Sequence, residues 1–124
     1  MAAGGTPRGR VGRGKDGEEK AAAFLEEKGL RILARNFRSR TGEVDLVAVD
    51  GDALVFTEVK TWSVYTADSL QHGISLKKQR RIIETAKYFL TVHREYNCMA
   101  VRFDVILICP DRIIHLDSAF TEDI

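Results

Sequence analysis

Four charged residues at even spacing along two apolar segments are the part of this chain best suited to chemistry. They are Glu43 and Asp45 before the turn at residues 50–52, and Glu58 and Lys60 after it. Val, Leu and Phe dominate both segments, and the Asp-Gly-Asp turn supplies the positive-φ glycine of a two-residue hairpin loop. Either Asp-Gly or Gly-Asp as the central pair puts the four charges on one face, because side chains alternate along a strand; a three-residue loop would separate them.

Three carboxylates and an ammonium on one face of an apolar hairpin indicate a metal site. A buried unpaired charge costs several kcal/mol. Val55, Phe56 and Val59 flank Glu58, as expected for a central strand that is apolar on both faces. A divalent cation would offset that cost. The alternative is that Glu58 and Lys60 form a salt bridge at a solvated strand end.

A helix predicted from Asp16 to Gly29 adds a further acid. Asp16 and Glu19 have the spacing of a capping box, and Gly29 suits a helix C-terminus. At about 100° per residue, Glu18 falls within the apolar stripe of this helix and Glu19 falls at its margin. Glu18 is therefore predicted to face a metal ion or its water. The alternative is an acid of the first turn that favours the helix dipole.

The remaining segments predict an α/β domain around the hairpin. A second helix, capped by Ser75, is expected to run to about Val92 after a loop at 61–73. Further strands are expected at residues 30–38, 102–108 and 112–116. A strand, a helix and another apolar strand favour a parallel, right-handed crossover. The predicted order is αβββαββ, a central mixed sheet with a helix on each side.

Composition indicates one globular domain. The 124 residues are 44% hydrophobic and 30% charged, which is ordinary for a single folded unit. We expect a flexible basic arm at 1–15, which is rich in Gly and Arg, and the domain at 16–124. No apolar run is long enough for a transmembrane helix or a secretory signal, so we expect a cytoplasmic protein without a membrane partner.

Basic residues are segregated although the formal net charge is only +1. Acid-free segments at 8–15, 31–40 and 77–81 concentrate Lys and Arg. The residues predicted to contact nucleic acid are Arg35, Arg38, Arg40, Lys77, Lys78, Arg80 and Arg81. The turn at 38–42 would deliver arginines beside the hairpin. The cations at 77–81 oppose the helix dipole, so an anion would explain them. A solvated loop and a solvated helix face are the alternatives.

These residues carry a resemblance to known families. An Asp on one strand, Glu-x-Lys on the next and a Glu on a preceding helix resemble the PD-(D/E)xK nuclease superfamily, especially its Holliday-junction-resolvase-like branch. Five segments also follow the order seen in the bacterial and largely uncharacterised YraN family. They are Gly17-Glu18-x-x-Ala21, Ala34-Arg35-Asn36-Phe37-Arg38, Gly42-Glu43-Val44-Asp45-Leu46, Val55-Phe56-Thr57-Glu58-Val59-Lys60 and Arg102-Phe103-Asp104-Val105.

The resemblance implies a restriction-endonuclease-like core and a DNA endonuclease that acts at branched or junction structures. Asp45, Glu58 and the main-chain carbonyl of Val59 would bind Mg²⁺ or Mn²⁺, which prefer oxygen ligands. Glu18 would hold a metal-bound water or a second ion, and Lys60 would orient the attacking water or offset charge on the phosphorane. Resolvases usually work as dimers, so the resemblance also implies a homodimer.

Two rival interpretations stay open. A non-catalytic nucleic-acid-binding or scaffolding module would keep the fold and the basic surface, and the near-neutral charge favours it. The presence of Glu18, Asp45, Glu58 and Lys60 together favours the enzyme. A protein-interaction domain without a nucleic-acid role would leave the acid-free basic segments unexplained.

Overall fold

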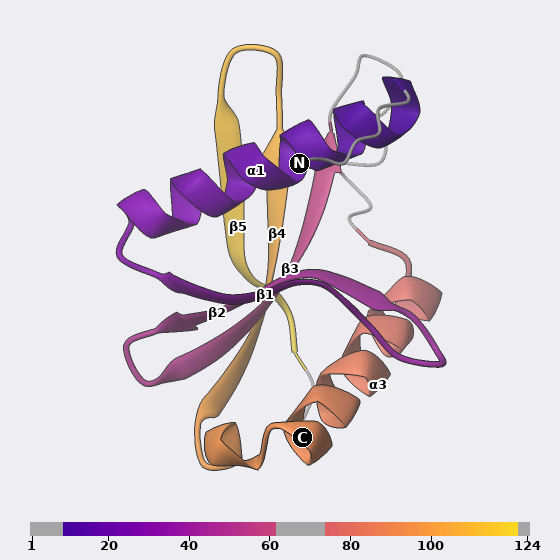
Figure 1. The fold of residues 1–124 in the computed structure, drawn as a ribbon, viewed down its shortest axis with the longest axis vertical. Coiled ribbons are helices and arrows are strands. Elements are labelled where there is room, and N and C mark those ends of the chain that lie inside the picture. Colours follow the sequence, from indigo (N-terminus) through magenta and orange to yellow (C-terminus); the bar gives the residue numbers. More distant parts are fainter. Residues whose placement is uncertain (1–8, 62–73, 122–124) are drawn as a thin grey trace.

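The computed structural model describes residues 9–61 and 74–121 (Figure 1). The helices are α1 (Gly9–Glu27), α3 (Leu76–Val92) and the short 3-10 helix η2 (Arg94–Tyr96). The strands are β1 (Arg31–Arg38), β2 (Glu43–Asp50), β3 (Ala53–Thr61), β4 (Ala100–Ile108) and β5 (Ile113–Phe120). Within these ranges no helix is both long and apolar enough to cross a bilayer.

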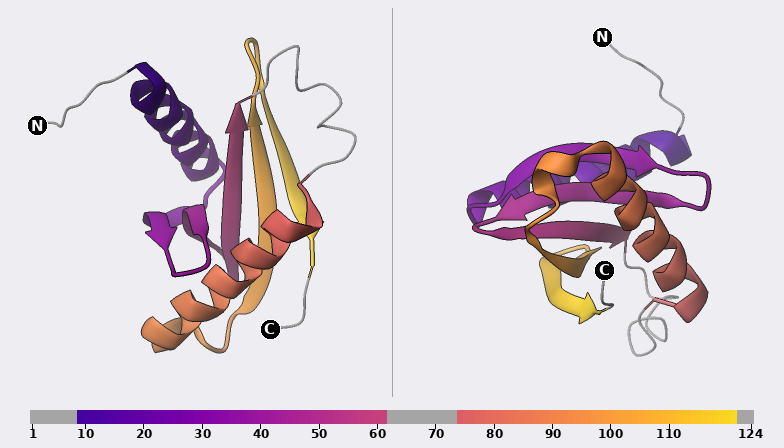
Figure 2. Two further views of the ribbon diagram at one scale, coloured as in Figure 1. Left: turned by 90° about the vertical axis from the view of Figure 1, so that its right-hand side faces the viewer. Right: turned by 90° about the horizontal axis from the view of Figure 1, so that it is seen from below.

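The five strands form one mixed sheet in the order β1-β2-β3-β4-β5. Neighbouring strands are antiparallel except β3 and β4, which are parallel and are joined through α3. Figure 2 shows α1 and α3 on opposite sides of this sheet. The predicted order αβββαββ and the predicted parallel pairing of β3 with β4 are confirmed, and the arrangement is consistent with a restriction-endonuclease-like core.

The β2–β3 hairpin has a two-residue loop. Asp50 pairs with Ala53, which leaves Gly51 and Asp52 between the strands, and Gly51 has a φ of 62°. Of the two central pairs that the sequence allowed, the structure uses Gly-Asp. The paired residues continue to Leu46 and Thr57, so the strand ends beyond them carry the charged residues.

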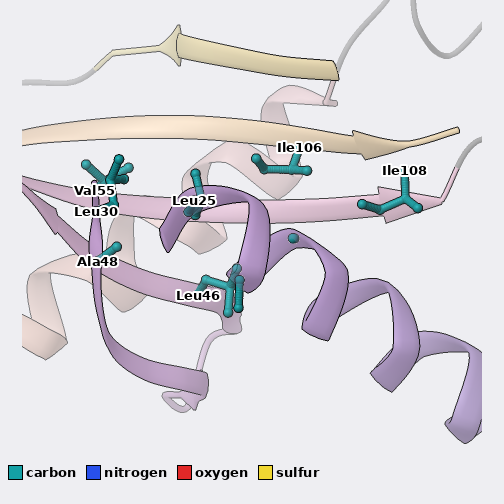
Figure 3. Close-up of a cluster of buried hydrophobic side chains, with 9 residues drawn as sticks. Leu25, Leu30, Leu46, Ala48, Val55, Ile106 and Ile108 are labelled. Atoms are coloured by element: carbon teal, nitrogen blue, oxygen red, sulfur yellow. The ribbon is translucent and has the colours of Figure 1, made fainter. Parts of the chain in front are cut away.

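Each face of the sheet has its own apolar core. Leu46 and Val55 pack under Leu25 of α1 (Figure 3). On the other face, Phe56 packs against Phe89 of α3. Both faces of β3 are therefore covered, as the sequence predicted for a central strand.

The prediction that the first helix begins at Asp16 is wrong. The helix begins at Gly9, and Asp16 lies inside it, where its carboxylate pairs with Lys20 one turn later at 3.4 Å. Residues 9–15 of the predicted arm are helical, and residues 1–8 lie outside the described ranges, as does most of the predicted loop at 61–73. A capping box is a weak local signal, and after Pro7 no proline interrupts the segment, so the helix can run through it.

The last strand is longer than the predicted 112–116. It reaches Phe120 across an irregularity at which Ser118 has a φ of 53°. The main-chain N–H of Ser118 donates to Asp104 Oδ1 at 3.0 Å. A buried carboxylate from the neighbouring strand thus satisfies the irregular backbone, which no local sequence signal shows.

A buried ionic network joins the hairpin turn, β4, β5 and the C-terminal end of α1. The side chain of Asp104 is fully buried and accepts two hydrogen bonds from Arg102, at 3.0 and 3.1 Å, and a contact of 2.7 Å from His115 Nε2. Lys28 Nζ lies 2.7 Å from His115 Nδ1. Lysine has no acceptor, so Nδ1 accepts and Nε2 carries the proton. Arg102 also binds Asp50 at 2.9 Å. Within the motif Arg102-Phe103-Asp104-Val105, the two charged residues therefore have a structural role in this network.

Candidate metal centre

Three carboxylates meet where α1 passes the start of β2. Glu18 comes from α1, and Glu43 and Asp45 come from β2. One oxygen from each lies within 4.8 Å of the others, and all three residues are half-buried. Such a cluster of hard oxygen donors suits Mg²⁺, Mn²⁺ or Ca²⁺.

Asp45 is the electrostatic centre of this cluster. Burial and the negative charge of Glu58 raise the pKa of Asp45 to about 7, and the charges of Glu18 and Glu43 add to the effect. A hydrogen bond from the Val59 main-chain N–H to Asp45 Oδ2, at 2.8 Å, lowers this pKa but does not offset the rest. No Lys or Arg of the described ranges forms an ion pair with Asp45. A divalent cation would supply the missing positive charge.

The hairpin opens at the point where these acids stand. The β2–β3 ladder ends at the pair Leu46 and Thr57. Beyond this pair, the Asp45 carboxylate accepts the main-chain N–H of Val59. Glu58 is still close enough for its charge to raise the pKa of Asp45.

Glycines allow both helices to approach these strand ends. A Cβ at Gly17 would lie 3.4 Å from Thr61 Oγ1, which shows that α1 packs directly on the end of β3. A Cβ at Gly42 would lie 3.1 Å from Arg81 Cβ and 3.4 Å from its carbonyl oxygen, so any side chain there would push β2 away from α3. Each glycine directly precedes an acid of the cluster, Glu18 or Glu43. Only at Gly42 would an added Cβ be too close to its neighbours, because the contacts at Gly17 are ordinary.

Asn36 is a site residue to which the sequence analysis gave no role. It lies on β1 with a φ of 51°, and its Nδ2 donates to Glu18 Oε1 at 3.0 Å. Asparagine adopts this left-handed conformation more readily than other side chains. The amide therefore orients Glu18 toward the cluster. Its position in the segment Ala34-Arg35-Asn36-Phe37-Arg38 was the only available signal.

Glu58 is held differently from the prediction. It is only 7% exposed, and its carboxylate pairs with Lys78 of α3. The three-carboxylate cluster therefore contains Glu43, which the sequence placed on this face without a role, and Glu58 stands beside it. Lys60 is half-buried, and strand alternation puts it on the Glu58 face.

The cations predicted to contact nucleic acid all lie at the surface. Two of them already bind acids: Lys78 pairs with Glu58, and Arg38 Nε lies 3.3 Å from Glu43 Oε1. The close approach at Gly42 brings the turn at 38–42 against Arg81. Two of the basic segments thus lie side by side, next to the carboxylates. The others, Arg35, Arg40, Lys77 and Arg80, are exposed.

Comparison with known proteins places the sequence of this chain in a family. A family model described as "Uncharacterised protein family UPF0102" matches residues 17–108. A UPF0102 protein of Treponema denticola is 44% identical over 121 residues, covering 86% of this chain and 93% of that protein. One from Persephonella marina is 43% identical over 115 residues, covering 90% and 95%. One from Anaeromyxobacter dehalogenans is 39% identical over 125 residues, covering 98% and 92%.

Proposed function

The chain belongs to the uncharacterised protein family UPF0102, and we propose that it is a metal-dependent endonuclease of the PD-(D/E)xK type that hydrolyses phosphodiester bonds in DNA. Asp45 carries the proposal. A half-buried carboxyl whose pKa is raised to about 7 by burial and neighbouring acids is costly for a fold to keep, and such groups concentrate at functional sites. A divalent cation would offset the repulsion between these carboxylates.

The residues present fit Mg²⁺ or Mn²⁺. Glu18, Glu43 and Asp45 each supply an oxygen within 4.8 Å of the others, slightly more than the separation of about 4.2 Å between opposite ligands of Mg²⁺. Glu58 and the carbonyl of Val59 are further candidate ligands on the facing strand. When bound, the ion would act as a Lewis acid on the scissile phosphate and would make a water acidic enough to attack it.

The chain's own cations would serve the phosphate. Lys60 would orient the attacking water or offset the charge that grows on the phosphorane. Arg38, Arg40 and Arg81 stand at the junction of the turn and α3, where the DNA backbone can pass beside the acids. Asp45 must lose its proton before it can act as a ligand, so metal binding should strengthen as pH rises toward about 7.

The test is cleavage of labelled duplex, flapped and four-way DNA with Mg²⁺ or Mn²⁺. Wild type should cut at least one of these, whereas Asp45→Asn and Lys60→Ala should not. Lys60→Ala should keep its affinity within a few fold, because ground-state binding would rest on the other cations. Lys20→Ala, a change at an exposed lysine on the same helix as Glu18, is the control and should cut normally.

One observation favours a second candidate, a non-catalytic nucleic-acid-binding module. Lys78 neutralises Glu58 without a metal, as expected of an active site that has lost its catalytic activity. A wild-type protein that binds all three DNA structures and cuts none with either ion would establish that reading.

A homodimer is part of the enzyme proposal. The described residues hold one carboxylate cluster per chain, and a four-way junction needs two cuts. Sedimentation with and without junction DNA would measure the stoichiometry.

A further inference from the structure

A cavity lies next to the acidic cluster, between the β1–β2 turn and α3. Its volume is about 430 Å³, and it is lined by Arg38, Ser39, Arg40 and Thr41 from the turn and by Glu84 and Tyr88 from the helix. This volume falls within the range of small-molecule sites, roughly 300–1,000 Å³. Two arginines, two hydroxyl residues and one tyrosine line this space together with one acid, Glu84, whose carboxylate lies 3.7 Å from Lys87 Nζ.

The walls of the cavity are fixed before any ligand arrives. The Ser39 main-chain N–H donates to the Gly42 carbonyl at 2.8 Å, which closes the turn. Ser39 Oγ lies 2.8 Å from Thr85 Oγ1, and Thr85 in turn donates to the Arg81 carbonyl, also at 2.8 Å. The backbone of the turn is thereby docked on α3, while the side chains of Arg38 and Arg40 extend from it into solvent.

Tyr88 is an exposed aromatic residue at the edge of the cavity. The residue is 48% exposed. Its ring packs on the ring of Phe37, with the two centroids 5.9 Å apart. One side of the ring is thus supported by the protein, and the rest faces the cavity and solvent. An aromatic ring held this way beside arginines is the arrangement with which proteins bind single-stranded nucleic acid.

We propose that this cavity binds one unpaired nucleotide of the substrate, with the base stacked on Tyr88 and its phosphates held by Arg38 and Arg40. The proposal rests on the proposed function and specifies its substrate class. A base paired inside a continuous duplex cannot stack on a side chain, so the preferred substrate has a single-stranded segment next to the cut, as in a flap or a splayed arm.

The position of Arg38 sets where the nucleotide lies. Arg38 lines the cavity, and its Nε is 3.3 Å from Glu43 Oε1, an acid of the metal cluster. One side chain thus separates the cavity from the cluster. The bound nucleotide is therefore next to the scissile phosphate in the strand and not at a remote site.

The experiment uses a flapped DNA with a fluorescent adenine analogue, quenched by stacking, at successive positions of the unpaired arm. Binding is measured in EDTA with the full chain. Wild type should quench the analogue at one position near the branch and should not quench it within continuous duplex. Tyr88→Ala should lose the quenching and bind the flap about tenfold more weakly, whereas Tyr88→Phe should behave like wild type. Val92→Ala, one helical turn further and 49% exposed, is the control.

A second measurement follows the phosphate contacts. Arg40→Ala should flatten the dependence of log K on log salt by about 0.7 for single-stranded DNA. Unchanged flap affinity and quenching in Tyr88→Ala would overturn the inference. Cleavage distinguishes it from the proposed function: quenching without any cutting would sink only the enzyme, and cutting of flaps without quenching would sink only the nucleotide cavity.

Discussion

Replacing Asp45 by Asn should stabilise the metal-free protein, and more so at high pH. The pKa of Asp45 rises from 3.8 to about 7 on folding. Because the folded-state pKa is raised, ionising this carboxyl opposes folding, and the cost grows as pH rises from about 4 to about 7. At about 1.4 kcal/mol per pKa unit, the free energy of unfolding of wild type should be lowered by about 2 kcal/mol at pH 5 and by about 4 kcal/mol at pH 8.

The Asn side chain keeps an oxygen that can accept the Val59 N–H, so the substitution removes the charge and little else. Urea unfolding in EDTA at both pH values gives the two free energies. Asp117→Asn, a change at an exposed acid on β5, is the control and should show no such difference. Equal effects of Asp45→Asn at pH 5 and pH 8 would show that this carboxyl titrates normally, and the main support for the metal site would be lost.

Three further predictions follow from the contacts. Asp104→Asn should lower the free energy of unfolding by about 3–5 kcal/mol, since it removes the buried carboxylate that accepts the hydrogen bonds of Arg102 and His115; a loss below 1 kcal/mol in urea unfolding would contradict this. Asn36→Gly keeps the left-handed backbone but removes the amide that holds Glu18, so calorimetry should show Mn²⁺ affinity several-fold weaker, and unchanged affinity would deny the orienting role. Lys78→Met should strengthen Mn²⁺ binding, because the ammonium of Lys78 no longer competes with the ion for Glu58. Lys77→Met should leave Mn²⁺ affinity unchanged, and equal Mn²⁺ affinities of the two variants would refute the competition.

The hairpin was predictable because its information is local. The Asp-Gly-Asp turn restricted the register to two choices, and the structure uses one of them. Alternation holds along the paired part of the strands but not at the charged end, where Val44 and Leu46 belong to the cores on opposite faces. The parallel β3–β4 pair also followed, since an intervening helix leaves few other connections. The start of α1 and the length of β5 did not follow. The second of these depends on Asp104 satisfying the backbone of Ser118, a contact between separate strands.

The site was predictable only as far as periodicity reaches. Strand parity predicted Asp45 and Glu58 on one face, and the helical stripe predicted that Glu18 faces them. The charge of Glu58 does act on Asp45, but Asp45 clusters with Glu18 of α1 whereas Glu58 pairs with Lys78 of α3. The partners of these acids depend on how the helices cross the sheet, which no window of sequence encodes. Lys78 is the instructive case: cations at the start of α3 oppose the helix dipole, and one of them is in fact paired with a buried carboxylate from β3.

The charges of the site form two groups with different consequences. Glu43 and Glu58 each have a cation of the chain beside them, Arg38 and Lys78 respectively. Asp45 has none among the described residues, so the electrostatic cost of the metal-free site falls on that one carboxyl. A divalent ion that draws Glu43 and Glu58 toward itself would release both cations at the edge of the cavity and the start of α3, where phosphates would pass. Metal and nucleic acid would then bind cooperatively, since each would complete the charge balance that the other leaves open.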